Sequence, residues 1–217
     1  MRDKITTFED KLEVLKKIEI DRDVLLYLKD RLIDLNIEIL GKYKGKIFDL
    51  ISRGKLEGWC WQTTESAIAF LDDDDYIERG YLNLSRRDSK YYHSWICFKY
   101  ENNEYVFDPC FGLLSDIDSY HNILDANVLG RVTAKDIKEE LIRQINNHFN
   151  SDKEREKNDF ITKFFGDEYY EKRKNEVVVH GPEDVNTALY RNGAGYTTEI
   201  EDNKIKKMTV HYYYTDC

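Results

Sequence analysis

The fold is decided by a run of aromatic and β-branched residues over positions 91–100, which reads Tyr91-Tyr92-His93-Ser94-Trp95-Ile96-Cys97-Phe98-Lys99-Tyr100. A polar segment at 101–104 separates this run from a second, shorter one at 105–108. Two such runs with a short polar connection predict a β-hairpin. Apolar side chains occupy both odd and even positions of the first run, for example Trp95 and Ile96. We therefore expect this strand to be buried on both faces, in the middle of a sheet.

Helical patterns lie on the N-terminal side of the hairpin. Residues 61–71 place small and apolar side chains on one stripe, and Cys60 stands at the N-terminus of this expected helix, on its inward face. The first 55 residues also read as helical, over 8–20, 24–40 and 46–52, because leucines and isoleucines recur every three or four residues. We predict a helical N-terminal lead-in over residues 1–55.

The C-terminal half of the chain alternates between strand-like and helix-like patterns of apolar residues. Residues 76–84 read as a further strand beside the hairpin, and residues 130–175 form a mainly helical segment. Residues 176–217 are β-rich, with strands expected near 176–180, 196–200 and 204–214. The sequence thus predicts one α+β domain over 1–217, with a core over 56–115.

Composition excludes several classes of protein. A chain of 217 residues with 41% apolar residues is long enough to bury one sizeable core. The net charge of −9 argues against a nucleic-acid-binding surface as the main role. No apolar run approaches the roughly 20 residues that span a bilayer, and the N-terminus lacks a signal-peptide core. We expect a cytoplasmic protein without a membrane or nucleic-acid partner; the oligomeric state stays open.

The cysteines and acids do not form a metal-ligand pattern. The four cysteines are irregularly spaced, without a Cys-x-x-Cys pair, and are expected to be free thiols: Cys60, Cys97, Cys110 and Cys217. The acidic run Asp72–Asp75 is read as a solvated loop, with a divalent-cation site as the alternative. We expect no metal and no cofactor.

Three residues carry the chemistry that the sequence suggests. Cys60 precedes His93 and Asp108 in the chain, each in a well-defined local context. A thiolate attacks a carbonyl, an imidazole takes and returns a proton, and a carboxylate orients the ring. Free backbone N–H groups at a helix N-terminus lower the pKa of a thiol and can bind an oxyanion. The predicted catalytic residues are Cys60 as nucleophile, His93 as general acid and base, and Asp108 as orienter.

This triad depends on the register of the hairpin. A tight turn centred on Asn102-Asn103 would place Asp108 opposite Cys97, four residues and about 13 Å along the strand from His93. A turn centred one residue earlier places Asp108 opposite Trp95, diagonal to His93 and within reach. The triad hypothesis therefore predicts the earlier turn, or a bulge near Glu101.

Each of these residues also has a purely structural interpretation. Cys60 can be a small buried hydrophobe, His93 a core histidine, and Asp108 a turn residue before Pro109. The tryptophans are read as core residues or, alternatively, as walls of a substrate cleft: Trp59, Trp61 and Trp95. Cys97 and Cys110 are read as packing residues, and no role is assigned to His121, His148, His180 or His211.

Three motifs resemble those of a known superfamily. Gly58-Trp59-Cys60-Trp61 resembles the nucleophile motif of transglutaminases and, more distantly, of papain; Tyr92 to Ile96 resembles their histidine strand and Tyr105 to Pro109 their Asp-Pro strand. The resemblance covers about residues 56–112. It implies a papain-like α+β core with the nucleophile helix packed on an antiparallel sheet. It also implies amide cleavage or acyl transfer on a peptide or protein substrate, through a thioester on Cys60. The alternatives are an inactive protein-interaction module of the same fold and a small-molecule acyltransferase.

Overall fold

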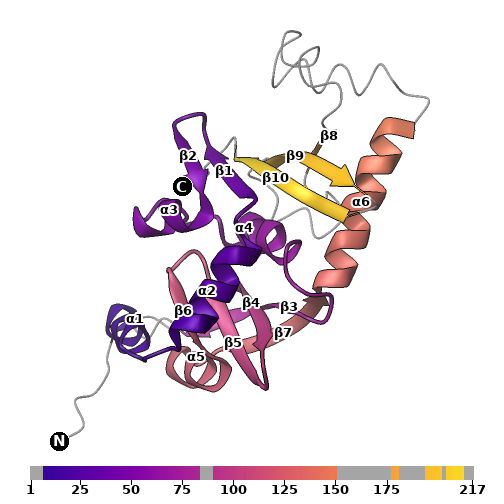
Figure 1. Cartoon of the computed structure of the whole chain (residues 1–217). Helices are drawn as coiled ribbons and strands as arrows, with labels where there is room; N and C mark the ends of the chain where they lie inside the picture. Colours follow the sequence, from indigo (N-terminus) through magenta and orange to yellow (C-terminus); the bar gives the residue numbers. More distant parts are fainter. Residues whose placement is uncertain (1–6, 84–89, 151–176, 181–193, 202–203, 213–217) are drawn as a thin grey trace, which may run out of the picture. The chain divides into compact units, whose positions relative to one another are not determined.

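The structure is a computed structural model that describes residues 7–83, 90–150, 177–180, 194–201 and 204–212 (Figure 1). These residues form a mixed α+β fold, with two five-stranded sheets and six α-helices in the described ranges. The chain divides into two compact units. The first comprises Met1–Ile33 and Ile47–Lys135, and the second comprises Asp34–Lys46 and Asp136–Cys217.

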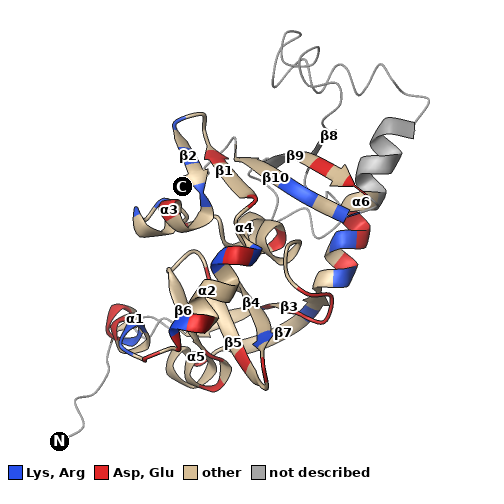
Figure 2. Ribbon diagram, in the orientation of Figure 1, with Lys and Arg blue, Asp and Glu red and all other residues tan. Residues whose placement is uncertain are grey.

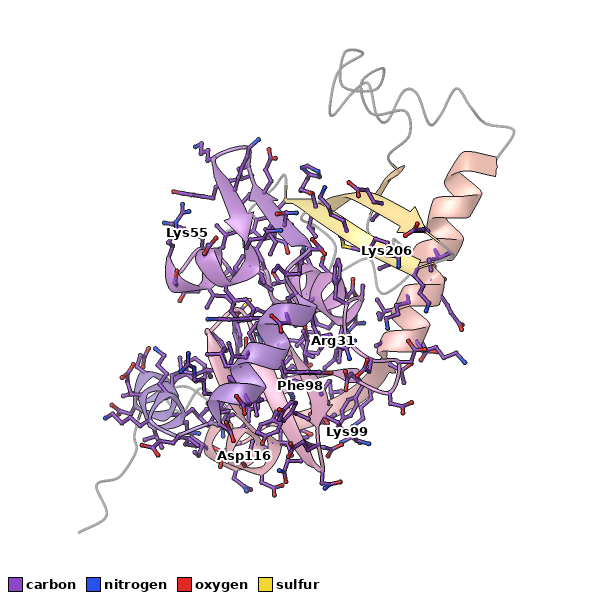
Figure 3. The ribbon with its side chains drawn as sticks, in the orientation of Figure 1. Arg31, Lys55, Phe98, Lys99, Asp116 and Lys206 are labelled. Atoms are coloured by element: carbon purple, nitrogen blue, oxygen red, sulfur yellow. The ribbon has the colours of Figure 1, made fainter. Side chains whose placement is uncertain are left out.

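The sheet of the first unit has the hairpin at its centre. Its strand order is β6 (Leu113–Asp116), β5 (Asn103–Asp108), β4 (Lys90–Tyr100), β3 (Tyr76–Asn83) and β7 (Asn127–Thr133), and neighbouring strands run antiparallel. The prediction that the 91–100 strand lies in the middle of a sheet is confirmed. The strand has apolar residues on both faces because both faces are covered: Trp95, Ile96 and Cys97 are all fully buried. Lys99, labelled in Figure 3, lies near the far end of β4 beside the buried Phe98.

Helices cover both faces of this sheet. The first-unit helices are α1 (Phe8–Lys16), α2 (Arg22–Arg31), α3 (Ile47–Ser52), α4 (Cys60–Ile68) and α5 (Ile117–Leu124). Leu15 of α1 and Tyr120 of α5 join the apolar cluster on the Trp95 face of the sheet. On the other face, Thr64 of α4 bonds Ser94 of β4, and Tyr27 of α2 stacks on Phe98.

The helix termini follow local sequence signals. Thr7 and Asp10 form a capping box at the start of α1, and Asp21 and Asp116 cap α2 and α5. Both signs of charge mark α1 and α2, which lie partly in solvent, whereas α4 carries little charge (Figure 2). All nine residues of α4 are buried. The helix that begins at Cys60 is therefore an interior helix.

The acidic run after α4 forms an ordered turn. The Asp75 carboxylate is buried and accepts hydrogen bonds from the backbone N–H groups of Asp72, at 2.9 Å, and Lys99, at 3.0 Å. Burial raises the pKa of Asp75, although these two N–H groups oppose the shift. The run thus ties the α4–β3 connection to β4 rather than remaining wholly solvated. Among the described side chains, no group of three or more histidines, cysteines and acids is placed to hold a metal ion.

The second unit contains a sheet that joins distant parts of the chain. Its order is β2 (Tyr43–Lys46), β1 (Leu35–Ile39), β10 (Lys204–Tyr212), β9 (Ala194–Glu201) and β8 (Val177–His180). β1 pairs with β10 in parallel, and the other pairs are antiparallel. The C-terminal segment that the sequence predicts to be β-rich contains β8, β9 and β10 in its described ranges. The helix α6 (Ala134–Asn150) agrees with the expected start of the 130–175 helical segment; residues 151–176 lie outside the described residues.

The prediction of an all-helical lead-in over 1–55 is wrong at residues 35–46. These residues form β1 and β2 instead of the end of the helix expected over 24–40. Leu28, Leu32 and Leu35 do recur at helical spacing, but Leu35, Ile37 and Ile39 also alternate with polar residues, which is a strand period. Pairing with β10 buries that alternating face and overrides the helical pattern. The helix expected over 8–20 is also shorter and ends at Lys16.

Within the ranges that the structure describes, none of the helices combines the length and apolar character needed to cross a membrane.

Candidate active site

The hairpin adopts the register that the triad hypothesis requires. β4 and β5 pair Tyr100 with Asn103 and Ile96 with Phe107, so the connecting loop consists of Glu101 and Asn102. Glu101 takes the left-handed conformation, with φ 54°. One further step in this register sets Asp108 opposite Trp95. The turn is thus centred one residue earlier than the Asn-Asn dipeptide suggests, and the expected shift is confirmed.

His93 and Asp108 form a buried pair. The Nε2 atom of His93 lies 2.8 Å from Oδ2 of Asp108, and both side chains are fully buried. Burial by itself lowers the pKa of His93, but the charge and hydrogen bond of Asp108, together with Cys60, outweigh it and raise the pKa to about 10. The imidazole therefore carries a positive charge at neutral pH.

Four donors surround the Asp108 carboxylate. Its Oδ1 accepts from the backbone N–H groups of Cys110, at 3.1 Å, and Phe111, at 3.3 Å. Its Oδ2 accepts from His93 and also from the Tyr120 hydroxyl, at 2.7 Å. The two backbone bonds arise because the chain turns at Pro109, directly after β5. They fix the rotation of the carboxylate so that Oδ2 faces the imidazole.

Cys60 is the first residue of α4, as predicted. Gly58 has φ 82°, a conformation that favours glycine, and Trp59 is the N-cap of the helix. The carbonyl of Cys60 accepts hydrogen bonds from the hydroxyls of Thr64, at 2.7 Å, and Ser94, at 3.2 Å. These contacts tie the start of α4 to the strand that carries His93.

The Cys60 thiol is strongly acidified. The neighbouring Cys110 thiol is the largest cause; burial opposes it, and the nearby His93 imidazolium reinforces it. The result is a pKa of about 5, so Cys60 is a thiolate at neutral pH. The Nδ1 atom of His93 makes no hydrogen bond of ordinary geometry within the described part of the chain. The thiol and ring thus interact at looser geometry than a full hydrogen bond, which is common in catalytic sites before substrate binds.

Cys110 belongs to the site, which the sequence did not reveal. Its Sγ donates to the Leu56 carbonyl at 2.9 Å, beside the turn that leads into α4. Burial is the main cause that raises the pKa of the Cys110 thiol well above its ordinary value. Cys110 therefore keeps its single proton, which it shares between the Leu56 carbonyl and the Cys60 sulfur, whereas Cys60 loses its own. Nothing in the sequence distinguishes Cys110 from Cys97, a second buried thiol.

Replacing Cys110 with alanine is expected to raise the pKa of Cys60 by about one unit, because a donor to the thiolate is lost. The pH dependence of Cys60 alkylation, followed by peptide mass spectrometry, measures this shift. Cys110→Ser retains a donor and should move the curve less. Cys97→Ala is the matched control, and an equal shift in that variant would contradict a specific role for Cys110.

The three tryptophans differ in their surroundings. Trp95 is fully buried and its Nε1 donates to Glu78 at 2.8 Å, so it occupies the core, one of the two expected roles. Trp61 stacks on Tyr92, with ring centroids 5.0 Å apart, and the Arg79 guanidinium lies 4.3 Å from its ring centroid. Trp59 and Trp61 flank Cys60 in the chain and are 3% and 6% exposed. Both stay candidates for contact with a substrate.

A buried polar cluster around Glu78, which the sequence did not predict, lies beside the site, because the Trp95 ring is 6.2 Å from the ring of His93. Glu78 is fully buried on β3 and accepts from Trp95, from His121 Nε2 at 2.6 Å and from Arg131 Nη2 at 2.7 Å. Arg131, Glu78 and Trp95 are register partners in one row across β7, β3 and β4. A charged residue inside a strand that is otherwise buried is the signal that could have found Glu78.

Aromatic rings close the histidine side of the site. The Phe111 ring lies 4.6 Å from the ring centroid of His93, and Phe8 of α1 packs edge-on against Phe111 at 5.1 Å. Cys60 is 5% exposed and His93 is fully buried. The thiolate and the imidazolium are therefore shielded from water, which strengthens the interaction between them.

No protein-family model matches this chain, and neither does any curated protein or solved structure. The resemblance of the three motifs to transglutaminases and papain therefore stays a prediction from the sequence, and the site is interpreted from its own geometry.

Proposed function

We propose that this protein is a cysteine enzyme of transglutaminase-like type, which cleaves or transfers an acyl group from an amide of a peptide or protein through a thioester on Cys60. The observation that carries the proposal is the joining of His93 Nε2 to Asp108 Oδ2 at 2.8 Å beside an acidified Cys60. A histidine whose Nε2 is held in this way has Nδ1 available for proton transfer.

The proposed reaction has two steps. The Cys60 thiolate attacks the amide carbonyl carbon, and backbone N–H groups at the start of α4 stabilise the oxyanion that forms. The His93 imidazolium gives its Nδ1 proton to the departing nitrogen, the carbon–nitrogen bond breaks, and an amine leaves a thioester on Cys60. Neutral His93 then takes a proton from water or from an acceptor amine, which attacks the thioester. The products are an acid or a new amide, the Cys60 thiolate and the His93 imidazolium.

A second function is favoured by the burial of the site. Cys60, His93 and Asp108 are 5%, 0% and 0% exposed, so a substrate reaches them only after side chains around the thiol move. A non-catalytic interaction module of the same fold would retain the triad as a buried polar cluster. The third possibility, acyl transfer to a small molecule, uses the same chemistry with a smaller acceptor.

Thiol labelling separates the enzyme from the interaction module. Iodoacetamide should alkylate Cys60 faster than Cys97 and Cys110 between pH 5 and pH 7, because Cys60 alone of these three has a lowered pKa. His93→Ala should raise the pKa of Cys60 and reduce its labelling at pH 6 by about tenfold, since the lower thiolate fraction outweighs the higher intrinsic nucleophilicity. Mass spectrometry of the labelled peptides gives each rate.

Two controls complete the labelling experiment. His121→Ala removes a histidine that contacts Glu78 rather than the thiol. The pH dependence of Cys60 alkylation should not change in this variant. Equal labelling of all three cysteines in the wild-type protein would favour the interaction module. In the enzyme, the Cys60→Ala variant should also fail to form a covalent acyl adduct with p-nitrophenyl acetate.

A further inference from the structure

The two oxygens of the Asp108 carboxylate accept hydrogen bonds from different kinds of donor. Oδ1 accepts two backbone N–H groups, whose positions the turn after β5 fixes, whereas Oδ2 accepts two side chains, His93 and Tyr120. The backbone bonds hold the orientation of the carboxylate by themselves. The hydroxyl of Tyr120, at 2.7 Å, is therefore not needed to aim Oδ2 at the imidazole, and it has another effect.

That effect follows from the sharing of a single oxygen. A hydroxyl that donates to Oδ2 withdraws part of the charge which would otherwise stabilise the imidazolium of His93. The side chains of His93 and Tyr120, which compete for the charge of Oδ2, are both fully buried, so water does not screen this competition. The Tyr120 side chain is held in place by the apolar cluster, and its ring packs 5.4 Å from that of Trp95.

We propose that Tyr120 is a positioning residue of the active site, which acts through Asp108 to set how strongly His93 holds its proton and hence how strongly the imidazolium stabilises the Cys60 thiolate. The inference rests on the proposed function. It assigns to α5, a helix outside the three motifs, the control of the balance between an acidic nucleophile and a general acid able to release its proton. A histidine that holds its proton too tightly is a poor acid toward the leaving amine.

The test uses the full chain and two opposite changes at position 120. Tyr120→Phe removes the donor, so Asp108 should bind the imidazolium more strongly and the pH of half-maximal Cys60 alkylation should fall by about 0.5 unit. Acylation of Cys60 by p-nitroacetanilide, whose leaving nitrogen needs a proton, should also slow, by about tenfold at pH 7, as general acid catalysis by His93 weakens. Replacing Tyr120 with 3,5-difluorotyrosine strengthens the donor and should raise the pH of half-maximal alkylation.

Tyr105→Phe is the matched control. Tyr105 lies three positions before Asp108 on β5, so its side chain points to the opposite face of the sheet, where it stacks on Phe98. This variant should retain the wild-type alkylation profile. Thermal unfolding confirms that each variant is folded, and the fluorinated protein, which keeps the shape of tyrosine, tests the proposal if the phenylalanine variant does not fold.

The outcomes separate this inference from the proposed function. Unselective labelling of Cys60 in the wild-type protein would overturn the proposed function. A selective wild-type Cys60 with the same profile in both position-120 variants would overturn only the role of Tyr120. An upward shift in Tyr120→Phe would also overturn it, because it would mean that the hydroxyl orients Asp108 rather than competing for its charge.

Discussion

Asp108→Asn is expected to slow the acylation of Cys60 by p-nitrophenyl acetate by at least about 100-fold while the protein stays folded. The two backbone N–H groups that bond Oδ1 require an acceptor at that position, so the amide oxygen of the asparagine should take it. The amide NH₂ then faces Nε2 of His93 and donates to it. The histidine must carry its proton on Nδ1, toward Cys60, and the neutral ring is no longer able to accept a proton there.

The measurement is the pre-steady-state release of p-nitrophenol at pH 7, with thermal unfolding as the check on folding. Asp118→Asn removes the same charge from an exposed position on α5 and should acylate at the wild-type rate. A rate for Asp108→Asn within threefold of wild type would show that Asp108 does not set the protonation of His93. The thiolate of Cys60 would then owe its low pKa to other groups.

Glu78→Ala is expected to lower the free energy of unfolding by about 3 kcal/mol. The change leaves the fully buried Nε1 of Trp95 without its acceptor and removes the partner of His121. Arg131 contributes less, because its side chain is 59% exposed and can regain water. Urea unfolding at pH 7 measures the loss. Glu78→Gln keeps an acceptor for Trp95 and should cost less.

The same carboxylate makes stability depend on pH. Burial raises the pKa of Glu78, but His121, Trp95 and Arg131 outweigh it and hold the pKa below its ordinary value. The stabilisation is therefore complete above the unfolded-state pKa of about 4.3 and is lost as the pH falls through the lower folded-state value. Between pH 5 and pH 3, Glu78→Gln should lose less stability than the wild-type protein. Glu13 is an exposed acid and provides the control, so Glu13→Gln should show the wild-type dependence of unfolding free energy on pH. The same dependence in all three proteins would contradict a stabilising role for ionised Glu78.

The hairpin shows which features local sequence predicts and which it does not. The alternation of aromatic residues over 91–100 predicted both the strand and its central position, because a strand apolar on both faces must be covered on both. The Asn-Asn dipeptide favoured a later turn, and the structure has Glu101 at positive φ instead. Register is fixed by pairing along the whole strand. β5 also pairs with β6, and a slip of one residue would turn Val106 and Asp108 to the opposite face.

The residues of the site also fall into those that the sequence identified and those that it did not. Cys60, His93 and Asp108 were identifiable because each lies in a local context that its chemistry requires. Tyr120 and Cys110 were not, since a tyrosine in an amphipathic helix and a cysteine after a strand look the same whether they contact a catalytic group or an apolar side chain. Glu78 had only one signal, an acid inside an otherwise buried strand, and that signal does not name its partners. Their partners lie 12, 50 and 43 residues away for the pairs Tyr120–Asp108, Cys110–Cys60 and His121–Glu78.

The sequence by itself determined the α+β class, the helix that begins at Cys60 and the hairpin that carries His93 and Asp108, because hydrophobic period and helix-start signals act over a few residues. Tertiary structure alone decided that residues 35–39 are a strand, since pairing with β10, about 170 residues further along, buries the apolar face of Leu35, Ile37 and Ile39. It also decided the hairpin register and the donors around Asp108. These features depend on contacts whose energy exists only when distant segments meet.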